Sequence, residues 1–170
     1  MIVLSVGVVI MSLVGAAGWI GGLRVNLTPS EPLGFWQIMP LDGPVVVGEV
    51  VFVCPPGTAG MRNALERGYL RRGLCPGGFA PLIKTVVAVA GDVVDLGQSV
   101  SIDGKMISGS RIMKKDGMGR DLSAYAGGVV PPGKVFLYSA FPGSFDSRYF
   151  GPLPVSSILG LAREVWTFVP

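Results

Sequence analysis

Histidine is absent from this sequence of 170 residues. The absence excludes a Ser-His-Asp triad and a Cys-His dyad, because both use imidazole as the general base. The 2 cysteines are too few for a four-cysteine metal site and no histidine could complete one, so we expect no metal and no cofactor. If a serine of this chain is a nucleophile, another side chain must take its proton, and lysine is the main documented substitute.

Charged side chains are also few, at 15% of the residues, and the net charge is only +3. The basic residues are scattered along the chain, and no aromatic side chains alternate with them as they do on many nucleic-acid-binding faces. We therefore expect no contact with nucleic acid.

Residues 1–23 contain no Asp, Glu, Lys or Arg. As a helix this stretch would rise about 34 Å, close to the thickness of the hydrocarbon core of a bilayer. Trp19 suits an aromatic anchor at the membrane interface. The pattern predicts a transmembrane anchor at residues 1–23. The alternatives are a signal sequence, although no Lys or Arg precedes the apolar run, and a buried core helix.

Residues 24–170 are rich in Val, Gly and Pro and lack long helical periods, which predicts one mostly β domain of short strands joined by turns. Asp103-Gly104 suits the type I′ turn of a hairpin. The expected strands lie within residues 45–53, 82–94, 100–107, 131–140 and 163–170, and the second of these is expected to end in a Gly-Asp turn. Residues 114–128 are expected to form a loop.

Cys54 and Cys75 bracket an insert, residues 54–75, that contains the expected helix. Met61, Leu65 and Tyr69 fall at i, i+4 and i+8, which predicts one short amphipathic helix with Gly73 as its stop signal. If the domain lies outside the cytoplasm, the two cysteines are expected to form a disulfide worth about 3 kcal/mol. The alternative is two unrelated buried thiols.

Lys84 is the lysine best suited to act as a base. It lies within "LIKTVVAV", where strand alternation gives it apolar neighbours on both faces. Burial disfavours the ammonium form and lowers the pKa of a lysine, and a neutral amine can accept a proton from a serine hydroxyl. The alternative is an edge-strand lysine whose head reaches water. The other lysines lie in turns or polar loops, at positions 105, 114, 115 and 134.

Ser30 is the corresponding candidate nucleophile. It lies in "NLTPSEPLGFW", directly after the apolar segment, where Pro29 and Pro32 restrict the backbone on either side. A serine in such a place is also common as a turn residue or a helix cap, so the residue by itself leaves both interpretations open.

Four segments together resemble the type I signal peptidase family of Ser-Lys membrane proteases. "TPS" at residues 28–30 is similar to the nucleophile segment, and "GEVVFV" at 48–53 to the strand that follows it. "IKTVVAVAGDVV" at 83–94 is similar to the strand that carries the base lysine. "SFDSRYFGPLP" at 144–154 is similar to the last conserved segment. All four occur in the family's order, and they run from residue 26 to about residue 160.

The resemblance implies a signal-peptidase-type β-fold, a Ser30–Lys84 catalytic dyad, and an oxyanion hole made of the Ser30 N–H and the Thr28 hydroxyl. It places the Ser144 hydroxyl against the lysine amine. Supporting and pocket residues are expected as well. Asp146 would shape the last segment and pair with Arg148, because Thr85 stands where the family usually has Arg, and Leu82 and Ile83 would line the substrate pocket.

The form "N-x-T-x-S-x-P-x-G-F", the short insert and the compact length resemble the TraF branch of the family. This implies processing of an exported preprotein, a propilin of a conjugative transfer system, with cyclisation of the pilin as an option. The resemblance also implies a single-pass protein of the bacterial inner membrane with its catalytic domain in the periplasm. Membrane lipid and other proteins of the conjugation apparatus are then expected partners.

Three alternatives were weighed against this interpretation. A general signal peptidase I would share the dyad. A non-catalytic assembly protein of the conjugation apparatus would have no need of it. A self-cleaving regulator of the repressor type would need a DNA-binding region ahead of the serine, where this chain has only the apolar segment.

Overall fold

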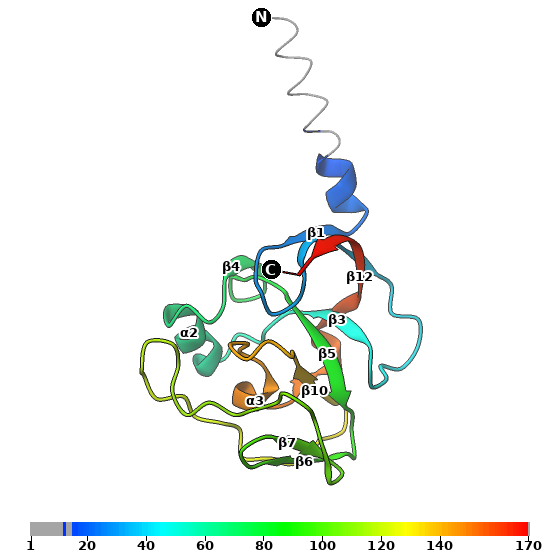
Figure 1. Ribbon diagram of the computed structural model, residues 1–170. Coiled ribbons are helices and arrows are strands. Elements are labelled where there is room, and N and C mark those ends of the chain that lie inside the picture. Colours follow the sequence, from blue (N-terminus) through cyan, green and yellow to red (C-terminus); the bar gives the residue numbers. More distant parts are fainter. Residues whose placement is uncertain (1–11, 13–14, 170) are drawn as a thin grey trace, which may run out of the picture.

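The structure, a computed structural model, describes residue 12 and residues 15–169 (Figure 1). Two antiparallel sheets are the main regular structure of this described part, which confirms the mostly β fold. The larger sheet has seven strands. In sheet order they are β1 (Leu23–Asn26), β2 (Leu33–Met39), β12 (Ile158–Phe168), β3 (Val50–Val53), β5 (Leu82–Ala88), β10 (Lys134–Tyr138) and β11 (Leu153–Pro154).

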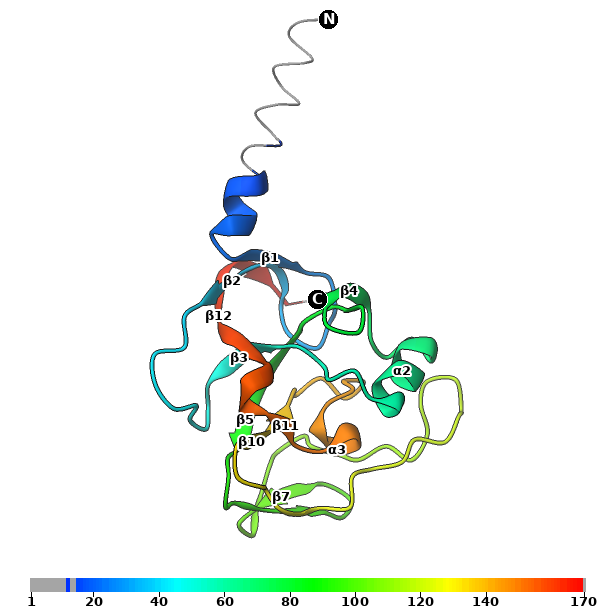
Figure 2. The same cartoon turned by 180° about the vertical axis from the view of Figure 1, so that it is seen from behind.

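The last strand in sequence, β12, lies between β2 and β3 (Figure 2). It pairs with β2 from Leu161↔Met39 to Phe168↔Leu33 and with β3 at Leu161↔Val51. The first hairpin, β1–β2, therefore joins the rest of the sheet through β12 alone.

The smaller sheet has four strands, in the order β8 (Lys105–Met106), β7 (Val100–Ile102), β6 (Val93–Leu96) and β9 (Gly128–Val129). The predicted hairpin turn is present, because Asp103 and Gly104 have φ angles of 49° and 76° and join β7 to β8. The buried strand expected from Leu82 is present as β5, which ends at Ala88, and the predicted Gly-Asp turn at residues 91 and 92 leads into β6 of the other sheet. The Asp92 carboxylate accepts a hydrogen bond from Val89 N–H in that turn, at 2.8 Å.

The insert contains helix α2 (Ala59–Glu66), which begins at the cap residue Thr58. The helix ends earlier than predicted, because Arg67 is its C-terminal cap and Gly68 has a φ of 81°. Tyr69 therefore lies beyond the helix, and Gly73 belongs to β4 (Arg72–Cys75).

The expectation of only one short helical element is also wrong. A further helix, α3 (Ser147–Phe150), and the 3-10 turn η1 (Val155–Ser157) lie within and just after the segment at 144–154. Their few residues give no helical period, so the sequence pattern could not reveal them.

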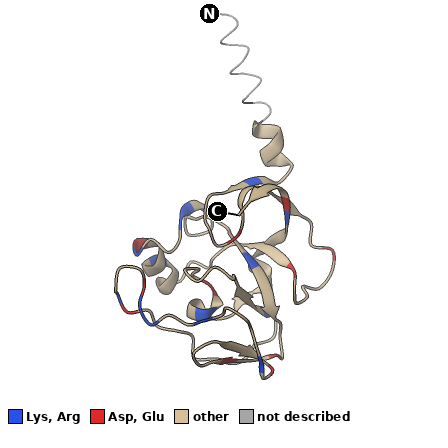
Figure 3. Ribbon diagram, viewed as in Figure 1, with Lys and Arg blue, Asp and Glu red and all other residues tan. Residues whose placement is uncertain are grey.

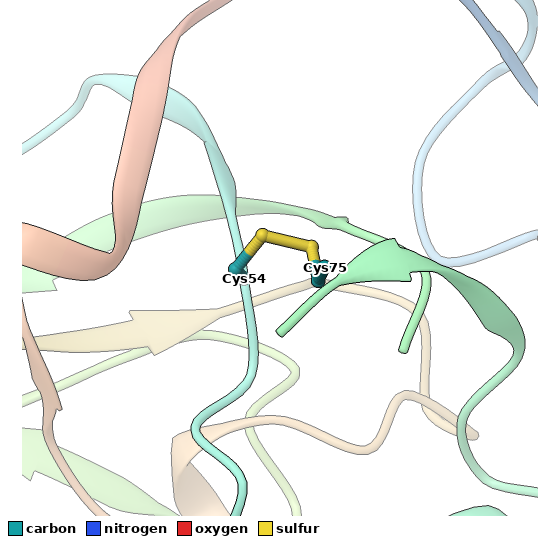
Figure 4. The surroundings of a disulfide bond; sticks show 2 residues. All are labelled: Cys54 and Cys75. Carbon is teal, nitrogen blue, oxygen red and sulfur yellow. A yellow bond between two sulfur atoms is a disulfide. The ribbon is translucent and has the colours of Figure 1, made fainter. Parts of the chain in front are cut away.

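The predicted disulfide between Cys54 and Cys75 is present and links the end of β3 to β4 (Figure 4). The Cα atoms are 5.5 Å apart, which lies in the usual range for a disulfide. Both cysteines are buried in the main core, with Met61 and Ala64 of α2 packed into the same cluster. The disulfide thus holds both ends of the insert on the core.

Only part of the strand expected at residues 45–53 forms. β3 begins at Val50, whereas Val46 and Val47 are exposed in a turn. The Glu49 carboxylate accepts a hydrogen bond from Val46 N–H, at 2.9 Å, and so stabilises the turn.

The predicted anchor at residues 1–23 lies largely outside the described residues. Of that stretch, residues 15–20 are helical, 21 and 22 form a turn, and Leu23 already belongs to β1. In the described part of the chain, no helix is both long enough and apolar enough to cross a bilayer.

Candidate active site

Ser30 lies in the loop between β1 and β2, and the side chain of Asn26 organises this loop. The Asn26 amide nitrogen donates to the carbonyls of Thr28, Glu31 and Pro32 at 3.0, 2.9 and 3.0 Å. Asn26 Oδ1 accepts from Thr28 N–H at 3.1 Å. One buried amide therefore binds main-chain atoms before and after Ser30, which fixes the shape of the loop.

The Thr28 and Ser30 hydroxyls face each other, with their oxygens 3.5 Å apart. The Thr28 hydroxyl donates to Asn26 Oδ1 at 2.8 Å, so its only proton is already engaged. In this state Ser30 is the donor in the weak contact with Thr28. To serve an oxyanion, the Thr28 hydroxyl would have to rotate away from Asn26.

The loop is also fixed to the large sheet. The indole N–H of Trp36, a residue only 1% exposed, donates to the Pro32 carbonyl at 2.9 Å. Gly34 has a φ of 127°, and a Cβ atom there would collide with the Trp166 carbonyl of β12. The sequence therefore requires glycine at this position for close strand pairing.

Lys84 lies in β5, opposite Val51 of β3, and is 2% exposed. Burial lowers the pKa of its ammonium group to about 8. The attraction of Asp146 and Glu31 raises this pKa, whereas the repulsion of Arg148 lowers it. The alternative of a solvated edge lysine does not hold, because β5 lies between β3 and β10 in the sheet.

Glu31, the neighbour of Ser30, interacts electrostatically with Lys84. Burial raises the pKa of the Glu31 carboxyl to about 7; Lys84 lowers it and Glu164 of β12 raises it. Both groups therefore titrate near neutral pH. Ser30 Oγ and Lys84 Nζ are not hydrogen-bonded to each other in the described structure.

Asp146 and Arg148 form an ion pair in which both side chains are fully buried. Arg148 Nε and Nη2 each donate to one carboxylate oxygen of Asp146 at 2.8 Å. Arg148 also donates to the carbonyls of Arg111 and Ser144, at 3.0 and 3.2 Å. The Asp146–Arg148 pairing expected in the absence of an arginine at position 85 is thus present, and its charges are well satisfied.

Ser139, at the end of β10, connects this ion pair to the nucleophile loop. Its N–H donates to Asp146 Oδ2 at 3.2 Å, and its hydroxyl donates to the Ser30 carbonyl. The hydroxyl also accepts from Phe141 N–H at 3.3 Å. A continuous chain of contacts therefore runs from Arg148 through Asp146 and Ser139 to Ser30.

Comparison with known proteins identifies the family. A family model described as "Signal peptidase, peptidase S26" matches residues 1–167. The chain belongs to this family.

Several S26 relatives act in conjugation according to their names. A probable conjugal transfer protein TraF of Sinorhizobium fredii (strain NBRC 101917 / NGR234) is 54% identical, over 99% of this chain and 91% of the relative. A conjugal transfer protein TraF of Agrobacterium fabrum (strain C58 / ATCC 33970) is 53% identical, over 98% and 95%. A plasmid transfer protein TraF of Escherichia coli is 36% identical, over 92% and 89%.

Among solved structures, the chain is similar to a signal peptidase I from Enterococcus faecalis V583. The TM-score is 0.42 at 20% identity, and the alignment covers 70% of this chain and 97% of that chain.

The remaining residues expected from the S26 resemblance lie in different surroundings. Ser144 is 4% exposed, and its hydroxyl oxygen has no hydrogen-bond partner among the residues that the structure describes. Leu82 packs against the main core, whereas Ile83 packs with Trp36 and Phe52 in a separate cluster. The structure therefore does not bring Leu82 and Ile83 together on one wall.

Sequence reasoning missed the roles of Asn26, Ser139 and Glu31. Asn26 belongs to the quoted loop pattern, so its position was visible but its three carbonyl contacts were not. Ser139 follows an apolar strand and carries no local signal, because its partner Ser30 is 109 residues away. Glu31 stands where the family usually has Met, so its position was visible, but its interaction with Lys84 was not.

Proposed function

We propose that this S26 protein is a serine endopeptidase in which Ser30 is the nucleophile and Lys84 is the general base. The burial of Lys84, together with its pKa of about 8, is the observation that carries the proposal. At pH 7 a pKa of 8 leaves about a tenth of the amine neutral, which is enough for a base that must later give the proton back. No other lysine in the described part of the chain has a buried side chain.

The Ser30 oxygen attacks the carbonyl carbon of the scissile bond while Lys84 Nζ takes the hydroxyl proton. The Ser30 N–H and the Thr28 hydroxyl stabilise the oxyanion, once that hydroxyl turns from Asn26. The lysine ammonium then protonates the leaving amine, and an acyl-enzyme forms. Water hydrolyses this ester with Lys84 again as the base. Since hydrogen bonds at catalytic sites often tighten only when substrate binds, Ser30 and Lys84 are expected to approach in that complex.

The proposed substrate is an exported preprotein, a propilin of a conjugative transfer system, that binds as an added strand next to the site. The names of the relatives support the conjugative role. The proposed location is the periplasmic face of the inner membrane, with residues 1–23 as the anchor. The Cys54–Cys75 disulfide supports this location, since disulfides persist in oxidising compartments.

The test is processing of a propilin of a conjugative transfer system, measured with the full chain in membranes. Ser30→Ala and Lys84→Ala should each abolish cleavage, whereas Lys105→Ala, in an exposed hairpin, should retain it. Conjugation should fail in cells carrying either of the first two variants. A folded Ser30→Ala protein that still supports conjugation would favour a non-catalytic assembly role instead.

A further inference from the structure

A cavity of about 680 Å³ lies between α2, Tyr69, residues 121–123 and the segment that contains α3 and β11. A second cavity, of about 340 Å³, shares Tyr69, Leu122, Phe145 and Tyr149 with it and reaches Ser144. The two cavities therefore lie next to each other, and together they are called the insert groove. It runs from Ser144 in the last S26 segment to the disulfide-bonded insert. Figures 1 and 2 both show α2, α3 and the long loop before β9 on the same side of the molecule.

The middle of the insert groove is aromatic. The ring of Phe145 lies 5.0 Å from that of Tyr69, 5.7 Å from that of Tyr149 and 5.5 Å from that of Phe150. Rings that pack on one another in this way keep their positions, so the walls are largely preformed. Apolar walls with a few polar groups are typical of ligand-binding grooves.

The charges around the insert groove are unbalanced. Arg67 and Lys134 both line the larger cavity, and neither has a carboxylate partner in the described part of the chain. Of the two nearby carboxylates, Asp116 pairs with Arg120 at 2.6 Å, whereas the exposed Asp121 lies 3.8 Å from Lys115 and points into solvent. Figure 3 shows both blue and red positions on α2 and on the long loop before β9. The groove is therefore complementary to a negatively charged group.

Arg67 is oriented for such a group. Its Nη1 donates to the Asp121 carbonyl at 2.8 Å and contacts the Tyr69 hydroxyl at 3.4 Å. Its Nε and Nη2 atoms have no hydrogen-bond partner among the described residues. These two nitrogens form one edge of the guanidinium, and such an edge binds both oxygens of a carboxylate.

We propose that the insert groove binds an extended segment of the peptide substrate and holds an Asp or Glu side chain of that segment against Arg67, with Lys134 adding attraction. The inference rests on the proposed function, because the bound segment would belong to the substrate of the proposed peptidase. An acidic side chain is the expected source of the carboxylate, since an endopeptidase acts within a continuous chain.

The test uses labelled peptides of 20 residues with Ala at the first and third positions before the cleaved bond. A single Glu is moved through the other positions, and each peptide has a Gln counterpart. Binding to the Ser30→Ala full chain is read by fluorescence anisotropy, which requires no cleavage. At one position Glu should bind about tenfold more tightly than Gln, and 0.5 M salt should reduce the difference.

Arg67→Gln should remove the preference for Glu and leave binding of the Gln peptide unchanged, which also reports that the variant is folded. Lys134→Gln should weaken the preference. Arg62→Gln is the matched control on α2, because Arg62 does not line the groove and should retain the full preference.

Three outcomes would overturn the inference. There could be no position at which Glu binds more tightly than Gln, the preference for Glu could survive Arg67→Gln, or Arg67→Gln could reduce the affinity for both peptides equally. None of them bears on the dyad, which cleavage of the Gln peptides by the unmodified chain reports separately. If a Glu peptide binds more tightly than its Gln counterpart but neither is ever cleaved, the groove inference holds and the peptidase proposal fails.

Discussion

The Ser139 hydroxyl donates a hydrogen bond to the main-chain carbonyl of Ser30, so the end of β10 is tied to a loop that lies 109 residues earlier in the chain. The Ser139 N–H in turn binds the carboxylate of the buried Asp146–Arg148 pair. Ser139 is therefore a positioning residue: it contacts the backbone of the proposed nucleophile and not its hydroxyl.

Ser139→Ala is expected to lower kcat by about 10- to 100-fold with little change in KM, because a small displacement of the nucleophile slows attack far more than binding. Ser139→Thr, which keeps the hydroxyl, should restore much of the loss. Ser110→Ala is the matched control, since Ser110 is also fully buried and hydrogen-bonded but lies in the smaller sheet region. Equal effects of Ser139→Ala and Ser110→Ala on kcat would assign Ser139 to stability alone.

The pH dependence of cleavage should report the buried amine. Because Lys84 must be neutral to act as a base, kcat/KM is expected to rise with pH and to level off above about 8. Steady-state rates from pH 6 to 10 provide the measurement. A rise that continues to pH 10 would mean that the amine is solvated in the free protein.

The same residue should make stability depend on pH. The pKa of Lys84 falls from 10.5 in the unfolded chain to about 8 in the folded protein, so the unfolded chain binds more protons between these values. The contribution of Lys84 to the free energy of unfolding should therefore increase with pH across that window. The free energy of unfolding of Lys84→Met, measured with urea, should lack this increase with pH.

Glu31→Gln is expected to shift the pH profile of kcat/KM to lower pH. The Glu31 carboxylate attracts the Lys84 ammonium and raises its pKa, so removal of the charge should leave the amine neutral at lower pH. Glu49→Gln, in the turn before β3, serves as the control and should leave the profile unchanged. A profile that stays in place in Glu31→Gln would show that the two groups do not interact in solution.

Reduction of the Cys54–Cys75 disulfide should lower the free energy of unfolding by about 3 kcal/mol, since it releases a loop of about 20 residues. For a chain of this size the melting temperature should then fall by about 6–12 °C. Calorimetry with and without reductant provides the measurement. The Cys54→Ala/Cys75→Ala variant should melt at the reduced value in both conditions. If the melting temperature of that variant still changes with reductant, the change does not come from this disulfide.

The sequence was most informative where a pattern is local. Asp103-Gly104 defines its own turn, and the run around Lys84 contains enough apolar residues to indicate burial. Boundaries that depend on tertiary contacts were less predictable. The Gly-Asp turn after β5 was predicted, and in it Asp92 accepts a hydrogen bond from Val89 N–H. The entry of the following strand, β6, into a second sheet was not, because strand alternation does not say which sheet a strand joins.

In the candidate site, too, local patterns were predictable from the sequence and tertiary contacts were not. Ser30 and Lys84 could be proposed from composition and from their surroundings in sequence, and the absence of histidine narrowed the choice of base. The network that holds them could not be proposed in this way. Asn26 and Ser139 act on main-chain carbonyls, and a carbonyl is common to every residue, so no pairing of residue types in the sequence points to such a bond.

The position of β12 has a consequence for biosynthesis. Because Ile158–Phe168 lies between the strands β2 and β3, the hairpin that carries Ser30 cannot join the strands that carry Lys84 until residue 168 has left the ribosome. A nascent chain of 150 residues would hold both residues of the proposed dyad without the strand that unites them. Proteolytic competence would then arise only after β12 has joined the sheet, so that a chain lacking this strand would be inactive.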